Sequence, residues 1–209
     1  MRRERLLHAG LPAGLVALAL GGCTMFQPAK DPKLYALEVD PGGRGASVTA
    51  GVPAILVSAP RARAGFETPA MVYLRRPHEL ESFARSQWVD APARMLAPLL
   101  VQSLEGGGRF RAVALVPSGV AAAVRLDTEI ESLLQDFTAR PSQVRFALRA
   151  QLVDLPERRV IATRAFEARE DAPSDDPYGG VVAANRAVAR VLGDLTEWCG
   201  AEVQPAGRE

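Results

Sequence analysis

The sequence predicts an α+β fold, namely a mostly antiparallel mixed sheet with two main helices packed on one face. Residues 124–135 and 143–153 alternate apolar and polar side chains with period two, which is typical of strands that have one face on a core and the other in water. Residues 177–199 separate apolar from charged side chains with the period of a helix. Only the apolar face of such a sheet needs a cover, so both helices are expected there.

The first 22 residues have the pattern of a lipoprotein signal peptide. Three arginines precede the apolar run Leu11–Leu20, which is shorter than the ~20 residues that a membrane span needs. The run ends in the lipobox-like sequence Leu20, Gly21, Gly22, Cys23. Cys23 is therefore expected to become the mature N-terminus, with a diacylglyceryl group on its sulfur and an acyl group on its nitrogen. The alternative is a plain signal peptide followed by an accidental cysteine.

Composition limits what the mature chain can be. Removal of 22 residues from 209 leaves 187, which suits one domain. The chain has 25 Lys and Arg against 24 Asp and Glu, and the leader removes three Arg and one Glu, so the mature net charge is −1. Such a balance argues against nucleic acid as a partner. The predicted organisation is a leader over 1–22, a lipidated tether over 23–32, one domain over 33–200 and a tail over 201–209.

The N-terminal half of the domain is expected to contain strands and one helix. Thr24 to Pro32 form a tether of nine residues that spans at most about 30 Å. A glycine-rich loop starts at Asp40. The expected strands are Lys33–Val39, Pro53–Ala59, Met71–Arg76 and Glu79–Trp88, and the second of them is apolar throughout, as in a strand buried on both faces.

The first helix is expected between Asp90 and Leu104. Asp90 can cap it, Pro92 suits its first turn, and Gly106 to Gly108 stop it. Pro98 lies inside the segment and is expected to start or kink the regular part of the helix.

The two alternating strands are expected to pair as an antiparallel hairpin around Pro141. Outward carboxylates on one strand and outward arginines on the next are expected to pair across the strands. A last strand is expected over Val160–Ala168. The inward residues are Val124, Leu126, Thr128, Ile130 and Leu134 in the first strand and Val144, Phe146, Leu148, Ala150 and Leu152 in the second; the outward residues are Arg125, Asp127, Glu129 and Glu131, then Arg145, Arg149 and Gln151.

The C-terminal helix is expected to start at Pro177, with Asp176 as its cap. Its apolar stripe contains Val188, Leu192, Leu195 and Cys199, and its charged stripe contains Arg186, Arg190, Asp194 and Glu197. Cys199 in the apolar stripe is interpreted as a small buried hydrophobe instead of a reactive thiol.

Enzyme signatures are absent from the sequence. It contains no G-x-S-x-G elbow, no phosphate loop and no H-E-x-x-H, and His78 is the single histidine of the mature chain. Asp175 and Asp176 form either a metal pair or helix caps, and capping is favoured. No catalytic, metal or cofactor-binding residue is therefore predicted; the only predicted site is the lipobox with its anchor at Cys23.

The order of motifs along the mature chain resembles the ABC-type transport auxiliary lipoproteins, a group that includes the paraquat-inducible protein C (PqiC) type. The segments that carry the resemblance are "LYAL", "PAILV", "MVYLRRPHELE", "SQWVDAP", "RFRAV", "VRLDTEIESLLQDF" and a final strand with Phe166 before the helix that starts with Asp-Pro. These are structural motifs, without a catalytic signature.

The resemblance implies an outer-membrane lipoprotein on the periplasmic face. Its implied partners are an ABC transporter and an MCE-domain protein that move lipids between two membranes, with phospholipid as a candidate ligand and a homo-oligomer left open. Thr24 after the lipobox cysteine fits sorting to the outer membrane. The second hypothesis is a structural or assembly lipoprotein that binds another envelope protein or the cell wall without handling lipid.

Overall fold

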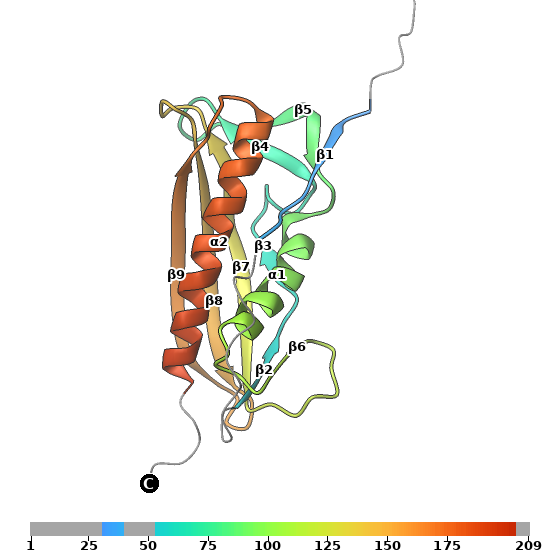
Figure 1. Ribbon diagram of the computed structural model, residues 1–209, viewed down its shortest axis with the longest axis vertical. Coiled ribbons are helices and arrows are strands. Elements are labelled where there is room, and N and C mark those ends of the chain that lie inside the picture. The colour runs from blue at the N-terminus through green and yellow to red at the C-terminus, as the bar shows by residue number, and fades with distance from the viewer. Residues whose placement is uncertain (1–30, 40–52, 204–209) are drawn as a thin grey trace, which may run out of the picture. The chain divides into compact units, whose positions relative to one another are not determined.

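The computed structural model describes residues 31–39 and 53–203. From Pro32 onward these residues belong to one compact unit. They form two helices and one open mixed sheet, so the predicted α+β class is confirmed (Figure 1). The elements are β1 (Lys33–Tyr35), β2 (Ala54–Val57), β3 (Arg61–Ala62), β4 (Ala70–Leu74), β5 (Glu81–Trp88), α1 (Pro92–Gly106), β6 (Ala112–Leu115), β7 (Val124–Asp136), β8 (Gln143–Asp154), β9 (Arg159–Asp171) and α2 (Pro177–Glu202).

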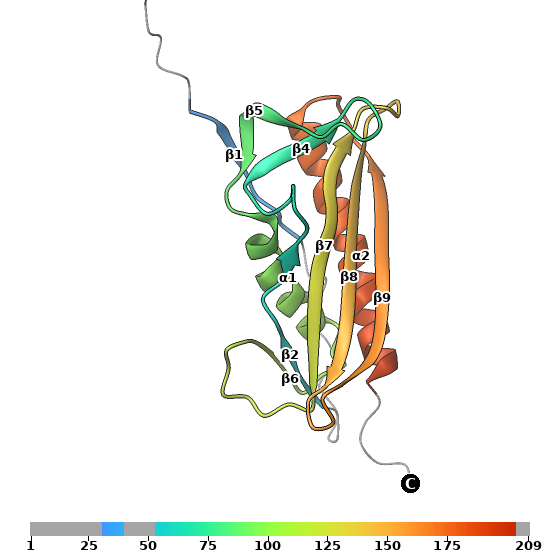
Figure 2. The same cartoon turned by 180° about the vertical axis from the view of Figure 1, so that it is seen from behind.

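A long antiparallel meander, β7–β8–β9, forms the larger part of the sheet (Figure 2). The alternation that predicted the hairpin is present in β8, where Phe146, Leu148 and Leu152 are fully buried while Arg149 is exposed. Strand β9 runs beyond its predicted end, as far as Asp171. The meander is therefore a wide surface with one apolar face.

The second edge of β7 is shared by three short strands. In order along β7, these are β2, β3 and β4, and all three run parallel to it. Strand β6 extends this side of the sheet from β2, whereas β5 and then β1 extend it from β4. Strands β3 and β6 were not predicted, because segments of two and four residues are too short to show a period.

A β-bulge in β7 reverses the side on which its last residues lie. Ile130 is opposite Leu148, but the next register pair is Ser132 with Ala147, so Glu131 is an extra residue without a partner. Beyond it, Leu133 joins the main core and Leu134 lies in a separate cluster with Phe66 and Val72. The prediction that Leu134 faces the same way as Ile130 was wrong, because one inserted residue exchanges the two faces of a strand.

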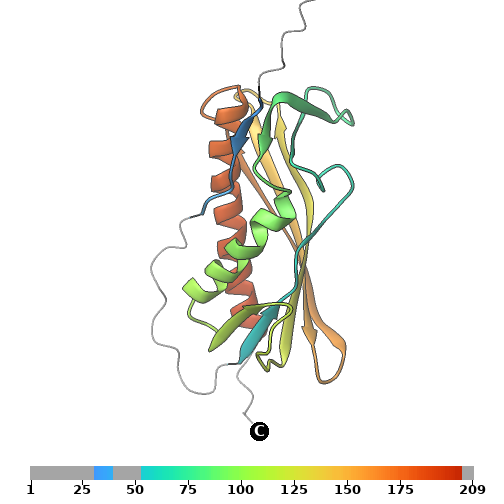
Figure 3. The same cartoon turned by 90° about the vertical axis from the view of Figure 1, so that its right-hand side faces the viewer.

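Both helices cover the same face of the sheet, as predicted (Figure 3). Helix α2 packs on β8 and β9, and α1 packs beside it. The hydroxyl of Ser103 lies 3.0 Å from that of Thr196, which links the two helices. Phe166 of β9 and Trp198 of α2 make an edge-to-face aromatic contact, with ring centroids 5.7 Å apart. The main core thus lies between the two helices and one sheet face.

Helix α1 differs from the prediction at its start. Its N-cap is Ala91, which makes no side-chain capping bond, so Asp90 is not the cap. The Asp90 carboxylate instead accepts hydrogen bonds from the Ala91 backbone and from Arg94, one turn later. Pro98 is exposed inside a helix that continues through it. The helix continues past the predicted Leu104 to Gly106, the first of the three glycines expected to stop it, and Gly108 follows with a φ of 62° that glycine adopts without strain.

Helix α2 agrees with its prediction. The Asp176 carboxylate accepts a hydrogen bond of 2.7 Å from the Gly179 backbone, and Pro177 occupies the first turn. The predicted apolar stripe is buried and the predicted charged stripe is exposed. The helix continues to Glu202, beyond the predicted Cys199.

Candidate functional site

The lipobox lies outside the described residues. Leu20, Gly21, Gly22 and the anchor Cys23 therefore stay predictions, as does most of the tether that follows them. None of the helices in the described residues is both long and apolar enough to span a bilayer.

The two side chains with potential reactivity, His78 and Cys199, belong to different parts of the fold and do not form a site. His78 is exposed in the turn between β4 and β5, and Cys199 is fully buried in α2. Burial raises the pKa of the Cys199 thiol to about 12, so it stays protonated at neutral pH. Within residues 31–39 and 53–203, no three His, Cys, Asp or Glu side chains form a group that could hold a metal ion.

Asp175 and Asp176 lie side by side in the chain but serve different backbone groups. Asp175 accepts a hydrogen bond of 2.8 Å from the Ser142 backbone, which ties the start of α2 to the β7–β8 turn. Asp176 caps α2. Backbone hydrogen bonds from Ser142 and from Gly179, respectively, lower the pKa of each carboxyl group. The capping interpretation therefore holds for Asp176, whereas Asp175 bonds to a turn outside the helix; both groups are negatively charged at neutral pH.

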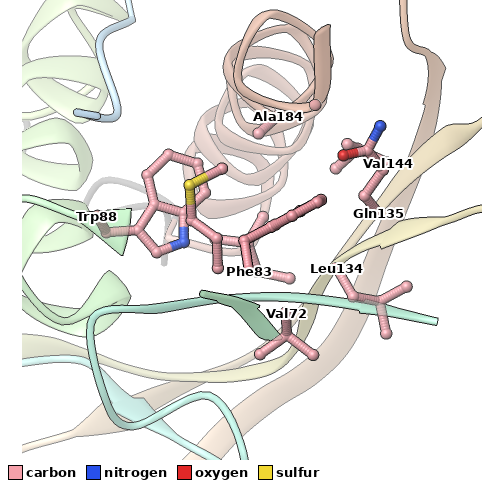
Figure 4. Close-up of a pocket in the computed structure, with 10 residues that line it drawn as sticks. Val72, Phe83, Trp88, Leu134, Gln135, Val144 and Ala184 are labelled. Carbon is pink, nitrogen blue, oxygen red and sulfur yellow. The ribbon is translucent and has the colours of Figure 1, made fainter. Parts of the chain in front are cut away.

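An apolar cavity lies between the end of the sheet and α2 (Figure 4). Phe83 and Trp88 line one side of it, and Gln135 lines the other beside Ala184 of α2. Its free volume is about 10 Å³, which is about the room that a single water needs. An acyl chain does not fit into such a space.

Gln135 explains why this cavity contains a polar wall. Its amide nitrogen donates to the Ser142 hydroxyl at 2.9 Å, while its oxygen has no hydrogen-bond partner among the described residues. Gly180 permits this packing, because a Cβ atom there would lie 2.3 Å from that oxygen. The cavity thus belongs to the packing of α2 on the sheet.

The sheet face opposite the helices is polar and uncovered over much of β7, β8 and β9 (Figure 2). Asp127 on this face accepts hydrogen bonds from Arg125 and Ser58. Burial alone would raise the pKa of Asp127, but these two hydrogen bonds together with the positive charges of Arg125 and Arg61 outweigh it, and the pKa is lowered. A depression of about 170 Å³ lies beside it, lined by Arg61, Glu129, Arg149 and Gln151 among others.

The expected ion pairs across the β7–β8 strands do not form as predicted. Glu129 and Arg149 are register partners, yet these two described residues make no ion pair with each other. Glu131 pairs instead with Arg63, which follows β3, at 2.5 Å. Asp127 pairs with Arg125 on its own strand at 2.8 Å. Glu129 and Arg149 are thus left to line the depression.

An open groove of about 520 Å³, here called the end groove, lies at the end of the sheet where α2 begins. Arginines, aromatic rings and the two aspartates of the α2 start line it together. Sequence reasoning did not find this groove, because its walls come from three segments that are far apart in the chain.

The comparison with protein families decides the classification. Residues 35–195 match the model of the ABC-type transport auxiliary lipoprotein component. The chain belongs to this family. The resemblance inferred from the sequence motifs is thereby confirmed, and the family description is that of an auxiliary transport component instead of an enzyme.

Solved structures share the fold of this auxiliary lipoprotein. Protein XCC0632 from Xanthomonas campestris is 22% identical with a TM-score of 0.69, and the match covers 81% of this chain and 96% of that chain. The hypothetical protein CT253 from Chlamydia trachomatis is 8% identical with a TM-score of 0.52, covering 72% and 97%, respectively. At such identities the likeness concerns the fold alone. A search of curated protein sequences found no match.

Proposed function

We propose that this auxiliary lipoprotein is anchored to the periplasmic face of the outer membrane and serves an ABC and MCE-type lipid transport system by docking or by lipid hand-over. The observation that carries the proposal is the family match over residues 35–195. The protein acts without catalysis and without a cofactor other than its own covalent lipid. Its partners are an MCE-domain protein and the components of the transporter.

The anchor is Cys23. One acyl chain binds a membrane only marginally, whereas two or more hold a protein there stably, so a cysteine with a diacylglyceryl and an N-acyl group anchors the domain. Nine residues separate Cys23 from Lys33, so the start of β1 stands at most about 30 Å from the anchor. This closeness raises the effective concentration of the domain for partners at that surface.

Replacement of Cys23 by Ser tests the anchor. In cells that grow with a palmitate analogue, the natural protein should incorporate the label. The Cys23→Ser variant should not, because it lacks the acylated sulfur. Label on the variant, or a mature chain that begins elsewhere, contradicts the assignment. A Cys199→Ser variant is the matched control and should keep its label.

Docking through the uncovered sheet face is favoured over storage of lipid in the interior. The cavity beneath α2 has a free volume of about 10 Å³, so an acyl chain does not fit into it. The uncovered face presents Arg149 and Glu129 without a mutual ion pair, and both are charged groups that a partner surface can complement. The alternative function is a structural or assembly role, with an envelope protein or the cell wall as the partner and no lipid handled.

Photo-crosslinking in cells separates the two functions. A photoreactive amino acid is placed at Arg149 or Ala165, which are exposed register partners on the uncovered face, and at Glu197 on the solvent side of α2 as the control. We expect an MCE-domain protein to be captured from the first two positions and not from the third. Capture of cell-wall or unrelated envelope proteins alone, with unchanged lipid asymmetry in a deletion strain, favours the structural alternative.

A further inference from the structure

The open groove at the start of α2 is formed by three segments. Arg75 follows β4 and Phe83 lies in β5; Phe137 and Arg140 belong to the β7–β8 turn; Asp175 and Asp176 precede α2. All three segments meet at one end of the sheet (Figures 1 and 2). The groove has a volume of about 520 Å³, within the range of small-molecule sites.

Two guanidinium groups form the positive part of this end groove. Arg75 and Arg140 are both exposed. The guanidinium of Arg75 lies 5.2 Å from the centre of the Tyr73 ring, a stacking contact that limits its orientations. Arginine forms paired hydrogen bonds with the oxygens of phosphate groups, so this part of the groove suits a phosphodiester.

The two carboxylates form the negative part. Their hydrogen bonds to the Ser142 and Gly179 backbones hold them in place and keep the pKa of each below its usual value. A carboxylate has about four acceptor positions, so each can take further bonds from a cation. Asp175 and Asp176 are thus fixed negative charges that border the same groove as the two arginines.

Aromatic rings form the apolar wall. The ring centres of Phe83 and Phe137 are 6.3 Å apart, and each ring also contacts Tyr73, at 4.5 Å and 5.7 Å, respectively. Phe83 and Phe137 are only half-buried. The cluster offers an apolar surface directly beside the charged groups, which suits an amphipathic ligand.

We propose that this groove binds the phosphoethanolamine headgroup of a phospholipid. Arg75 and Arg140 hold the phosphodiester, Asp175 and Asp176 hold the ammonium, and the glycerol end lies against Phe83 and Phe137. Two positive and two negative groups match a zwitterion, whereas a headgroup with only a negative charge would face both aspartates. Access to lipid rests on the proposed anchor at Cys23.

The position of the groove fits such access. Strand β1 starts at the end of the domain where α2 starts (Figures 1 and 3). The positive charge of Lys33 also contributes to the lowered pKa of Asp176, after the hydrogen bonds from Gly179 and Ser174. The anchored end of the domain is therefore the end with the groove. A membrane surface within about 30 Å of Lys33 is the nearest source of phosphoethanolamine headgroups.

Calorimetry on the full-length lipoprotein in a non-ionic detergent tests the site. The titrants are the water-soluble dibutyryl phosphatidylethanolamine, dibutyryl phosphatidylglycerol with the same chains but no ammonium, and inorganic phosphate. We expect the ethanolamine lipid to bind at least about tenfold more tightly than the glycerol lipid, as for the loss of one hydrogen bond between charged groups. Equal binding of all three, or binding of inorganic phosphate alone, overturns the headgroup assignment.

Substitutions locate the site. Arg75→Gln and Arg140→Gln should each lower the binding affinity for both lipids about tenfold. Asp176→Asn keeps a capping side chain and should lower the affinity for the ethanolamine lipid alone. The preference for the ethanolamine lipid over the glycerol lipid should therefore decrease. Arg158→Gln, at the β8–β9 turn at the other end of the sheet, is the control and should change neither. An equal effect of Arg158→Gln, or no effect of the groove variants, contradicts the proposal.

Failure of the headgroup site can be distinguished from failure of the proposed docking function. If no headgroup binds but Arg149 and Ala165 still capture an MCE-domain protein, the groove proposal fails alone. If headgroup binding follows the groove residues while capture of that partner fails, docking to an MCE protein is overturned and the lipid site stands.

Discussion

At the scale of single residues, Cys199 shows how position decides the chemistry of a side chain. It lies in the apolar stripe of α2 with no exposed surface, where desolvation disfavours the thiolate and raises the pKa to about 12. Since the thiolate is the reactive form, a cysteine in these surroundings behaves as a small apolar group.

Thiol labelling tests this state of Cys199. In a Cys23→Ser variant, Cys199 is the only remaining cysteine of the two in the sequence. We expect no reaction with a thiol reagent at pH 8 in native buffer and one thiol per chain in strong denaturant. Rapid labelling of the native variant would show that the C-terminal turns of α2 open readily.

Asp176 is expected to stabilise α2 through its cap. Asp176→Ala should lower the free energy of unfolding by about 1 kcal/mol, whereas Asp176→Asn should lose less because it keeps an acceptor oxygen. The folded pKa of Asp176 lies below its ordinary value of 3.8, so the stabilisation by its charge is present above about pH 4 and disappears as the pH falls through the lower, folded value. Urea unfolding of the natural protein and both variants at pH 7 and pH 3 measures both effects. A difference in stability between the natural protein and Asp176→Asn that does not change with pH would contradict the role of the charge.

At the scale of elements, the C-terminal helix was predicted well because one pattern repeats over its full length. Leu192 and Leu195 are buried as the helical period requires, and Asp176 and Pro177 mark the start by local chemistry. The first helix lacked such agreement at its start: Asp90 is of a residue type that often caps helices, but it bonds to Arg94, and Ala91 is the N-cap.

Truncation of Leu192 tests the packing of α2. Leu192→Ala should reduce the free energy of unfolding by about 2 to 5 kcal/mol, because it leaves a cavity between the helix and the sheet. Glu197→Ala on the exposed side is the control and should change stability by less than about 0.5 kcal/mol. Urea unfolding followed by tryptophan fluorescence gives both values. A loss below about 1 kcal/mol at Leu192 would mean that the helix is loosely attached.

Other features could not be predicted from local patterns. The bulge at Glu131 places Leu134 on the opposite face, and no residue type there marks an insertion. The parallel pairing of β2, β3 and β4 with β7 joins segments separated by many residues. The end groove likewise depends on three distant segments, so Arg75 and Arg140 were not singled out. The lipobox was inferred from consecutive residues, but it lies outside the described residues and stays a prediction.

At the scale of the whole domain, the surface has a sheet face covered by helices, an open sheet face and an end that follows the proposed anchor. The helices cover one sheet face and the opposite face stays open (Figure 3). The open face presents charged residues such as Arg149, and the proposed anchor precedes β1 in the chain. A partner that approaches the open face does not have to displace either helix. Under the proposed function, the domain contacts a membrane through its anchored end and a protein through its open face.

The unequal edges of β7 also have a dynamic consequence. Along one edge, β8 pairs with nearly the whole length of β7, interrupted by the bulge at Glu131, whereas the other edge is divided among β2, β3 and β4, each joined to β7 over two or three residues. A long ladder opens only with the whole domain, but a short strand can detach by itself at a lower free energy. Amide hydrogens of β8 should therefore exchange with deuterium more slowly than those of β4, and Leu192→Ala should accelerate only the former. Local opening of β4, which directly precedes Arg75, would let the end groove widen while the β7–β8–β9 meander beneath α2 keeps its hydrogen bonds.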